Sequence, residues 1–354
     1  MRKLWALPAM VMLVACGGGG GSSNNVAQPV TSVSDWLIPV DRVVDGGPGR
    51  DGIPSIDNPL FVPLDQAEVR PEDLVIGIKA GDEVKAIPHD IMDWHEVLND
   101  NLQTEPVVLS YCPLTGSALL WKATPSDPDV TFGVSGLLFN SNLILFDRET
   151  GSHWLQMRGQ SVEGLRRGEM PETLPLVETR FDTWQEMYPN SLVLSRMTGF
   201  TRSYDNYPYN DFRSSPDLLF AVEPFDTRLF EKARVLGVQM NNVARAYEIQ
   251  RSSIGIEVIN DSIDGVPIVV VLSAGKNFGA IFERTLDDGT VLTFSPSSEP
   301  LPTVMTDDEG NTWDVFGEAL TGLRTAERLP LTKSHTAYWY AWAAFHPGTE
   351  IHDG

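Results

Sequence analysis

The chain contains one sequence pattern twice, and this internal duplication limits the possible folds more than any other feature. Residues 96–109 align with residues 257–270 without a gap, and six of the 14 aligned positions are identical. Self-similarity of this kind marks a repeated structural unit. Further matches keep the same order and include Gly77 with Gly237, Asn99 with Asn260, Pro106 with Pro267, Trp154 with Trp313 and Trp184 with Trp342. We therefore predict one fold present in two copies, repeat A over residues 72–195 and repeat B over residues 232–354.

Each repeat has the pattern of short strands joined by turns. Residues 75–87 form a predicted hairpin, because apolar runs flank a Gly-Asp turn. A turn or single helical turn is expected at residues 88–93, and a short helix at residues 183–187. Further strands are expected at residues 96–100, 106–111, 116–122, 130–134 and 138–147. The predicted fold class is mainly β (a β-rich α+β protein), with two tandem pseudo-repeats of hairpins, strands and short helices that pack as one unit through Trp and Val/Ile faces.

The N-terminal stretch is not expected to belong to the fold. Arg2 and Lys3 precede an apolar run that is too short to span a bilayer as a helix. The run ends in Leu-Val-Ala-Cys at residues 13–16, which resembles the lipobox of bacterial lipoproteins. This resemblance implies lipidation of Cys16, whereas the alternative is an ordinary secretory signal with an incidental cysteine. The resulting segments are a signal peptide at residues 1–15, the lipidated cysteine and a Gly/Ser tether at 16–30, an irregular lead-in at 31–71 and a linker at 196–231.

The expected partner of the chain is a lipid bilayer, reached through the lipidated Cys16. Gly17 follows this cysteine instead of aspartate, and the sorting habit of such lipoproteins then implies the outer membrane of the cell envelope, facing the periplasm. Acidic residues outnumber basic residues 48 to 26, which gives a net charge of −22. This excess argues against nucleic-acid binding and against docking on anionic lipid through surface charge.

A specialised site is expected where the two repeats differ chemically. The main differences are His95 against Ile256, Tyr111 against Leu272 and Cys112 against Ser273. If residues 94–112 form a hairpin, one register places His95 across from Tyr111, and a shift by one residue places it across from Cys112. Both registers would bring His95 within one diagonal step of Cys112.

A cysteine beside a histidine would support two kinds of chemistry. An imidazolium lowers the pKa of a thiol, so Cys112 could act as a nucleophile with His95 as its base. The same pair could bind a transition metal, with His89 and His153 as further ligands. The other residues expected to bind a ligand are Glu96, Tyr111 and Asn140. The alternatives are a buried, inert Cys112 at the end of an apolar strand and a His95 that belongs to the core.

Other patterns in the sequence carry less information about chemistry. The chain has two cysteines, so with Cys16 as the anchor no disulfide framework is expected. It contains no CxxC, HExxH, GxSxG, GxGxxG or P-loop motif. Glu96, Asn99 and Asp100 recur in repeat B, which favours structural roles. The Tyr-rich residues 203–211 could line a groove for a sugar or peptide or form a packed connecting loop.

Longer motifs extend through nearly the whole mature chain. They are residues 52–59, 94–100, 111–116, 132–140, 147–151, 194–199 and 338–347. With these motifs the chain resembles a bacterial family catalogued as domain of unknown function (DUF) 3179. The resemblance implies that the Trp94-His95-Glu96 and Tyr111-Cys112-Pro113 segments are hallmarks of the family. Many members have a second cysteine where this chain has Thr115, so a dithiol redox role is not expected here.

These observations leave three hypotheses about function. The first is a lipid-anchored cell-envelope protein that binds a metal or small ligand at a repeat A site around His95 and Cys112. The second is a thiol enzyme in which Cys112 is the nucleophile and His95 the base. The third is a structural surface lipoprotein without a site. Whether the protein is an enzyme stays open, and so does the identity of any cofactor beyond the option of a transition metal.

Overall fold

The computed structural model describes residues 35–123, 127 and 129–353 of the chain. Within these residues the protein is mainly β, with six sheets and three short α-helices, which confirms the predicted fold class. None of the described helices is long and apolar enough to cross a membrane. The predicted signal peptide, Cys16 and the tether lie outside the described residues.

Repeat A and the lead-in form three sheets. The first sheet has the order β13 (Leu176–Arg180), β3 (Leu74–Ala80), β4 (Glu83–Pro88), β14 (Leu192–Leu194) and β2 (Phe61–Pro63). The second has the order β12 (Thr173–Leu174), β7 (Ser117–Lys122), β6 (Glu105–Cys112) and β5 (Val97–Leu102). The third has the order β1 (Val43–Asp45), β8 (Phe132–Phe139), β9 (Asn142–Asp147), β10 (His153–Leu155) and β11 (Gln160–Glu163). The helices are α1 (His89–His95) and α2 (Phe181–Met187).

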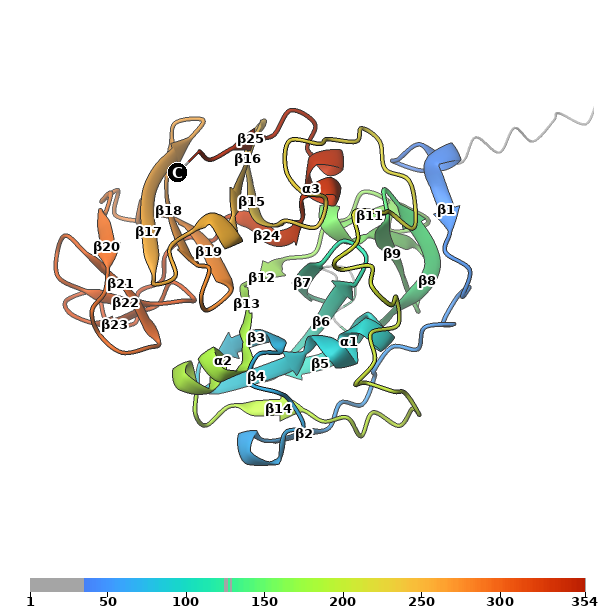
Figure 1. Ribbon diagram of the computed structural model, residues 1–354, viewed down its shortest axis with the longest axis horizontal. Helices are drawn as coiled ribbons and strands as arrows, with labels where there is room; N and C mark the ends of the chain where they lie inside the picture. The colour runs from blue at the N-terminus through green and yellow to red at the C-terminus, as the bar shows by residue number, and fades with distance from the viewer. Residues whose placement is uncertain (1–34, 124–126, 128, 354) are drawn as a thin grey trace, which may run out of the picture. The chain divides into compact units, whose positions relative to one another are not determined.

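Repeat B has the same plan in three further sheets (Figure 1). The first has the order β24 (Lys333–Tyr338), β15 (Arg234–Met240), β16 (Val243–Glu248) and β25 (Glu350–Ile351). The second has the order β17 (Glu257–Ile263), β18 (Val266–Ser273) and β19 (Phe278–Glu283), and the third β20 (Phe294–Pro296), β21 (Thr303–Asp307), β22 (Thr312–Asp314) and β23 (Ala319–Thr321). Helix α3 (Trp339–Phe345) corresponds to α2, while the short 3-10 helix η4 (Ile249–Arg251) stands where repeat A has α1.

The agreement between the repeats extends to single side chains. The amide of Asn99 bridges the backbone of Phe132 with two hydrogen bonds, both 2.9 Å long. Asn260 bridges the backbone of Phe294 in the same way, at 2.8 and 2.9 Å. Each asparagine therefore joins the second sheet of its repeat to the third. This gives Asn99 the structural role that its recurrence in repeat B suggests.

The indole rings kept in both copies form the packing core. Trp184 and Trp342 are fully buried and lie against Gly77 and Gly237, the middle residues of β3 and β15. The indole N–H of Trp184 donates to Ser191 Oγ at 2.9 Å, and that of Trp342 donates to Thr349 Oγ1 at 3.0 Å. A buried indole is thus packed and hydrogen-bonded in both repeats.

The two repeats contact each other reciprocally. The N–H of Arg180, at the end of β13, donates to the carbonyl of Lys276 at 3.3 Å, and the N–H of Tyr338, at the end of β24, donates to the carbonyl of Thr115 at 2.7 Å. Strands β13 and β24 have matching places in the two repeats, and Arg180 corresponds to Tyr338. The two contacts are therefore equivalent, one made by repeat A on repeat B and the other by repeat B on repeat A. Figure 1 shows β13 next to the orange strand β19 of repeat B, and this strand pair is in contact.

Two local predictions for repeat A are wrong. In place of the strands expected at residues 130–134 and 138–147, β8 covers residues 132–139 and β9 covers residues 142–147, and the turn between them lies at Asn140 and Ser141, both with positive φ. Helix α1 continues through His95, and Glu96 then turns the chain with a φ of 57° before β5 begins at Val97. His95 therefore ends a helix and does not lie on the strand that pairs with β6.

Candidate functional site

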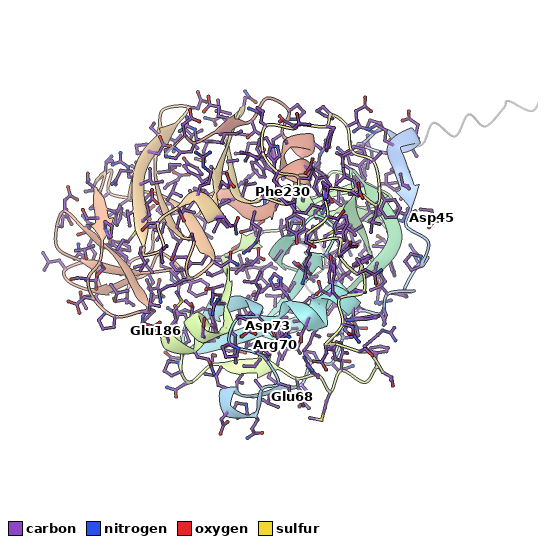
Figure 2. The ribbon with its side chains drawn as sticks, viewed as in Figure 1. Asp45, Glu68, Arg70, Asp73, Glu186 and Phe230 are labelled. Carbon is purple, nitrogen blue, oxygen red and sulfur yellow. The ribbon has the colours of Figure 1, made fainter. Side chains whose placement is uncertain are left out.

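A cavity of about 410 Å³ lies where repeat A, the connecting segment 196–231 and repeat B meet. This volume is within the range of about 300–1,000 Å³ found for small-molecule sites. Its polar lining, which defines what we call the junction cavity, comprises His89, Tyr111, Glu178, Arg213, Lys232, Arg234, Glu248, Gln250 and Tyr338. Phe230, labelled in Figure 2, belongs to the apolar part of the lining.

Three cationic side chains converge on the junction cavity. Arg234 Nη2 lies 3.2 Å from Glu178 Oε2, so its charge is matched by a buried carboxylate. Arg213 Nη2 lies 2.6 Å from Asp93 Oδ1, and its guanidinium lies 4.0 Å from the centroid of the Tyr207 ring.

The third cation, Lys232, is buried and donates to the backbone carbonyl of Asp217 at 2.6 Å. Among the residues that the structure describes, no carboxylate lies within 4.0 Å of its ammonium nitrogen. Burial lowers the pKa of Lys232. Its charge is therefore the one least compensated in the cavity.

His89 and Glu178 form a buried pair with unused hydrogen-bonding capacity. His89 Nε2 lies 3.1 Å from Glu178 Oε2, but neither this nitrogen nor Glu178 Oε1 makes a hydrogen bond of good geometry with the described residues. Burial lowers the pKa of His89, against the opposing effect of Glu178. Burial also opposes ionisation of Glu178, but Arg234 and His89 outweigh it, so the pKa of Glu178 lies below its usual value. The pair therefore offers an ionised carboxylate and a neutral imidazole.

Two tyrosines complete the lining. The Tyr111 ring packs against His89 at a centroid distance of 4.5 Å, and its hydroxyl is 3.4 Å from Arg213 Nη2. Tyr338 lies across Gly116, whose φ is 57°; a β-carbon there would come within 2.8 Å of the Tyr338 ring. Glycine is therefore required at position 116 for the tyrosine of repeat B to reach the cavity of repeat A.

Four consecutive residues at the end of α1 hold the connecting segment in place. Asp93 pairs with Arg213, and the Trp94 indole N–H donates to the carbonyl of Asn206 at 3.1 Å. Nε2 of His95 hydrogen-bonds the Tyr204 hydroxyl at 2.8 Å, and the Tyr209 hydroxyl donates to Glu96 Oε1 at 3.3 Å. The segment predicted as an aromatic groove or a packed loop is thus a packed loop, and this loop delivers Arg213 to the cavity.

The structure does not bring His95 and Cys112 together. His95 Nδ1 lies 2.8 Å from the carbonyl of Pro54, and its Nε2 is occupied by Tyr204. The Cys112 thiol lies 3.6 Å from the carbonyl of Ser141. No hydrogen bond or ring contact joins the two side chains within the described part of the chain. The pairing of Val97 with Ser110 corresponds to the register that would place residue 95 across from Cys112, but the left-handed turn at Glu96 removes His95 from that strand.

The surroundings of Cys112 favour a neutral thiol. Burial raises the pKa of Cys112 to about 11, and the nearby Glu96 adds to the effect. Burial also raises the pKa of Glu96 to about 8. Neither change provides the cationic neighbour that an activated thiolate needs.

Cys112 is therefore expected to resist alkylation in the folded protein. Native protein treated with iodoacetamide at pH 7.5 should stay unlabelled at this residue, and labelling should become complete only after unfolding in guanidinium chloride. Mass spectrometry of the peptide that contains Cys112 measures this directly. Rapid labelling of the native protein would restore the thiol-enzyme hypothesis.

The remaining predicted site residues lie apart from the junction cavity. The Asn140 side chain accepts from Arg42 Nη2 at 2.7 Å and from the N–H of Glu223 at 3.1 Å, and it donates to the carbonyl of Ala344 at 3.4 Å. It therefore ties the lead-in, the connecting segment and α3 to the turn between β8 and β9. Glu96 faces a separate small chamber with Cys112 and Tyr209.

The described residues contain no group of three or more His, Cys, Asp or Glu side chains that could hold a metal ion. His153, which we considered as a ligand, lies 2.7 Å from Glu163 and stacks on Trp36. His89 faces Glu178 and Tyr111 instead of Cys112. The metal set His95, Cys112, His89 and His153 therefore finds no support in the geometry.

Sequence reasoning identified Tyr111 and His89 but missed the charged residues of the cavity. Glu178 corresponds to Thr336 of repeat B. Glu178 pairs with Ile76 of β3, and Thr336 pairs with Leu236, the matching residue of β15. Arg234 corresponds to Leu74 by the same pairing. These are chemical differences between the copies, which is the signal that we applied to residues 95–112 only.

Comparison with known proteins gives a family and no function. The sequence model of a family described as "Protein of unknown function (DUF3179)" matches residues 50–349. No curated protein and no solved structure matches the chain. The match covers the whole of repeat A and of the connecting segment and most of repeat B.

Proposed function

The chain belongs to the DUF3179 family, and since that family has no described function, we propose from the geometry that this member binds a small organic acid in the junction cavity. The carrying observation is the convergence of Arg213, Lys232 and Arg234 on one cavity in a chain whose net charge is −22. Arginine and lysine side chains, which donate charge-assisted hydrogen bonds, are the groups that proteins use to bind carboxylates.

The unused hydrogen-bonding atoms of the cavity support the same proposal. Buried polar atoms without partners are costly, and a bound ligand is one way of satisfying them. Glu178 Oε1 can accept a hydrogen bond from a ligand hydroxyl or ammonium group, and the Lys232 ammonium can donate to a ligand carboxylate. A hydroxy or amino acid would use both groups.

The test is binding of small carboxylates to the purified full chain. Acetate, lactate, succinate and citrate are titrated separately, and a rise in Tm with concentration reports binding. Lys232→Met should weaken binding at least about tenfold, because it removes one charged hydrogen bond. Lys276→Met is the matched control, since Lys276 pairs with Glu186 on the surface and does not line the cavity. If none of the four acids changes Tm, the structural lipoprotein without a site becomes the better hypothesis.

We also propose that the protein is anchored to the outer membrane through a lipidated Cys16, facing the periplasm. The support is the sequence around residues 13–16. Cys16→Ser should release the protein from the membrane fraction into the soluble fraction, and mass spectrometry of the wild-type N-terminal peptide should show the acyl chains. An unmodified Cys16 in membrane-free protein would contradict the anchor while leaving the cavity proposal intact.

A further inference from the structure

We propose that the ligand of the junction cavity places a carboxylate on Arg213 beside Asp93, and that Asp93 takes up one proton from solvent when the ligand binds. This inference rests on the proposed function and specifies which group of the ligand the site recognises and how pH controls the affinity. The O–H bond on Asp93 is the one covalent bond that forms, its proton comes from solvent, and no oxidant or reductant is required.

The geometry places the Arg213 guanidinium between the cavity and the buried carboxylate of Asp93. Arg213 lines the cavity, whereas Asp93 lies behind it and accepts from Arg213 Nη2 at 2.6 Å. The guanidinium has five N–H donors, so its cavity-facing donors are available to a ligand while Asp93 keeps its bond. Tyr207 lies against the guanidinium and the Tyr111 hydroxyl lies 3.4 Å from Nη2, so Arg213 is fixed in this position.

If the buried carboxylate of Asp93 shares Arg213 with a second carboxylate, the two cannot both remain ionised at low cost. Like charges at close range raise the pKa of one member of the pair, as in the aspartic protease dyad. The charged and titratable groups that act on Asp93 are Arg213, Asp90, Glu96, Tyr111, Tyr207 and Tyr338. Arg213 is the one cation that contacts its carboxylate among the described residues, so a ligand anion there removes the main stabilisation of its charge.

Asp93 is poised to respond near neutral pH. Burial raises its pKa to about 7 in the free protein, although Arg213 opposes the change. At pH 6 Asp93 is then already mostly protonated, and binding needs no further proton. At pH 8 it is mostly ionised, and binding must take up close to one proton. The affinity should therefore be nearly independent of pH below about 6 and fall about tenfold per pH unit above about 7.

Isothermal titration calorimetry with acetate, lactate and succinate tests this inference. Each acid is titrated between pH 6 and 8.5 in two buffers with different ionisation enthalpies, so that the difference in heat gives the number of protons taken up. Asp93→Asn should abolish the proton uptake at pH 8 and bind about tenfold more tightly there than the wild type. Asp226→Asn is the matched control, because it changes the same group in an ion pair of the connecting segment that does not line the cavity.

The outcomes separate this inference from the proposed function. Binding without proton uptake at pH 8 overturns the role of Asp93 but leaves the cavity as an acid-binding site. Absence of binding for these three acids and for citrate overturns both. If Asp93→Asn does not fold, ¹³C NMR of the aspartate carboxyl groups in the wild type decides: a pKa of Asp93 that rises with ligand supports the inference, and an unchanged pKa contradicts it.

Discussion

Replacing Gly77 by alanine is expected to lower the free energy of unfolding by about 3 kcal/mol, at the upper end of the cost of overpacking a core. A β-carbon at this position would lie 1.9 Å from Cζ3 of Trp184, a ring that is fully buried. The matching change Gly237→Ala would place a β-carbon 2.4 Å from the Trp342 ring, with a similar loss. Chemical denaturation of each variant measures the effect as a shift in the midpoint at constant slope.

The duplication supplies the control for this prediction. Trp184→Phe should recover part of the stability lost in Gly77→Ala and none of that lost in Gly237→Ala, because each indole contacts the glycine of its own repeat. Trp342→Phe should recover part of the stability lost in Gly237→Ala and none of that lost in Gly77→Ala. Gly255→Ala is the neutral comparison, since the nearest atom to its β-carbon would be Ser253 Oγ at 3.8 Å. Equal rescue by either phenylalanine would mean that the loss comes from strand propensity and not from the indole contact.

The sequence predicts those elements of the fold that depend on the local pattern of apolar and turn residues. Strands β3 to β7 and their counterparts β15 to β19 follow from Val, Ile and Leu runs between turns, and each strand of the first copy has a counterpart in the second. The sequence pattern predicts a turn or a single helical turn at residues 88–93, whereas α1 has seven residues, about two turns, and ends at a histidine that is followed by a glutamate in the left-handed conformation. No local pattern in residues 94–97 indicates a positive φ at Glu96.

The candidate site was harder to predict because its contacts are made between repeats. Arg234 on β15 and Glu178 on β13 are far apart in the sequence and meet where the two repeats contact each other. Neither residue has a neighbour in the sequence that marks it as functional. The motif Trp94-His95-Glu96 was recognised as a hallmark, but its physical role is to bind the loop that carries Arg213. A sequence motif can thus mark residues that position a site and not the residues that line it.

The largest effect at the cavity is expected for Arg234→Met, with a loss of about 3–5 kcal/mol in the free energy of unfolding. The substitution removes a positive charge 3.2 Å from Glu178, whose side chain is 1% exposed, and leaves that carboxylate buried without its main partner. Removing both charges should cost much less, because a buried pair of apolar side chains is often as stable as the ion pair. Arg234→Met with Glu178→Met should therefore recover most of the loss.

The pH dependence of the stability loss in Arg234→Met shows whether the loss comes from an unpaired charge or from lost packing. In the wild type the pKa of Glu178 lies below its usual value, so its contribution is present at neutral pH and is lost as pH falls through that lowered pKa. In Arg234→Met the same carboxylate loses its cation and its pKa rises, so protonation relieves the penalty at mildly acidic pH. The stability difference between wild type and Arg234→Met should then be largest near pH 7–8 and shrink toward pH 5.

Arg245→Met gives the matched comparison for this effect. Arg245 also pairs with two carboxylates, Asp261 and Glu350, but it is 20% exposed and its partners reach solvent. Loss of such a surface pair should cost no more than about 1 kcal/mol. If Arg234→Met costs no more than Arg245→Met, Glu178 is not held ionised by Arg234. The cavity would then hold one negative charge fewer than we assign to it, and a ligand ammonium group would not find an anionic partner in Glu178.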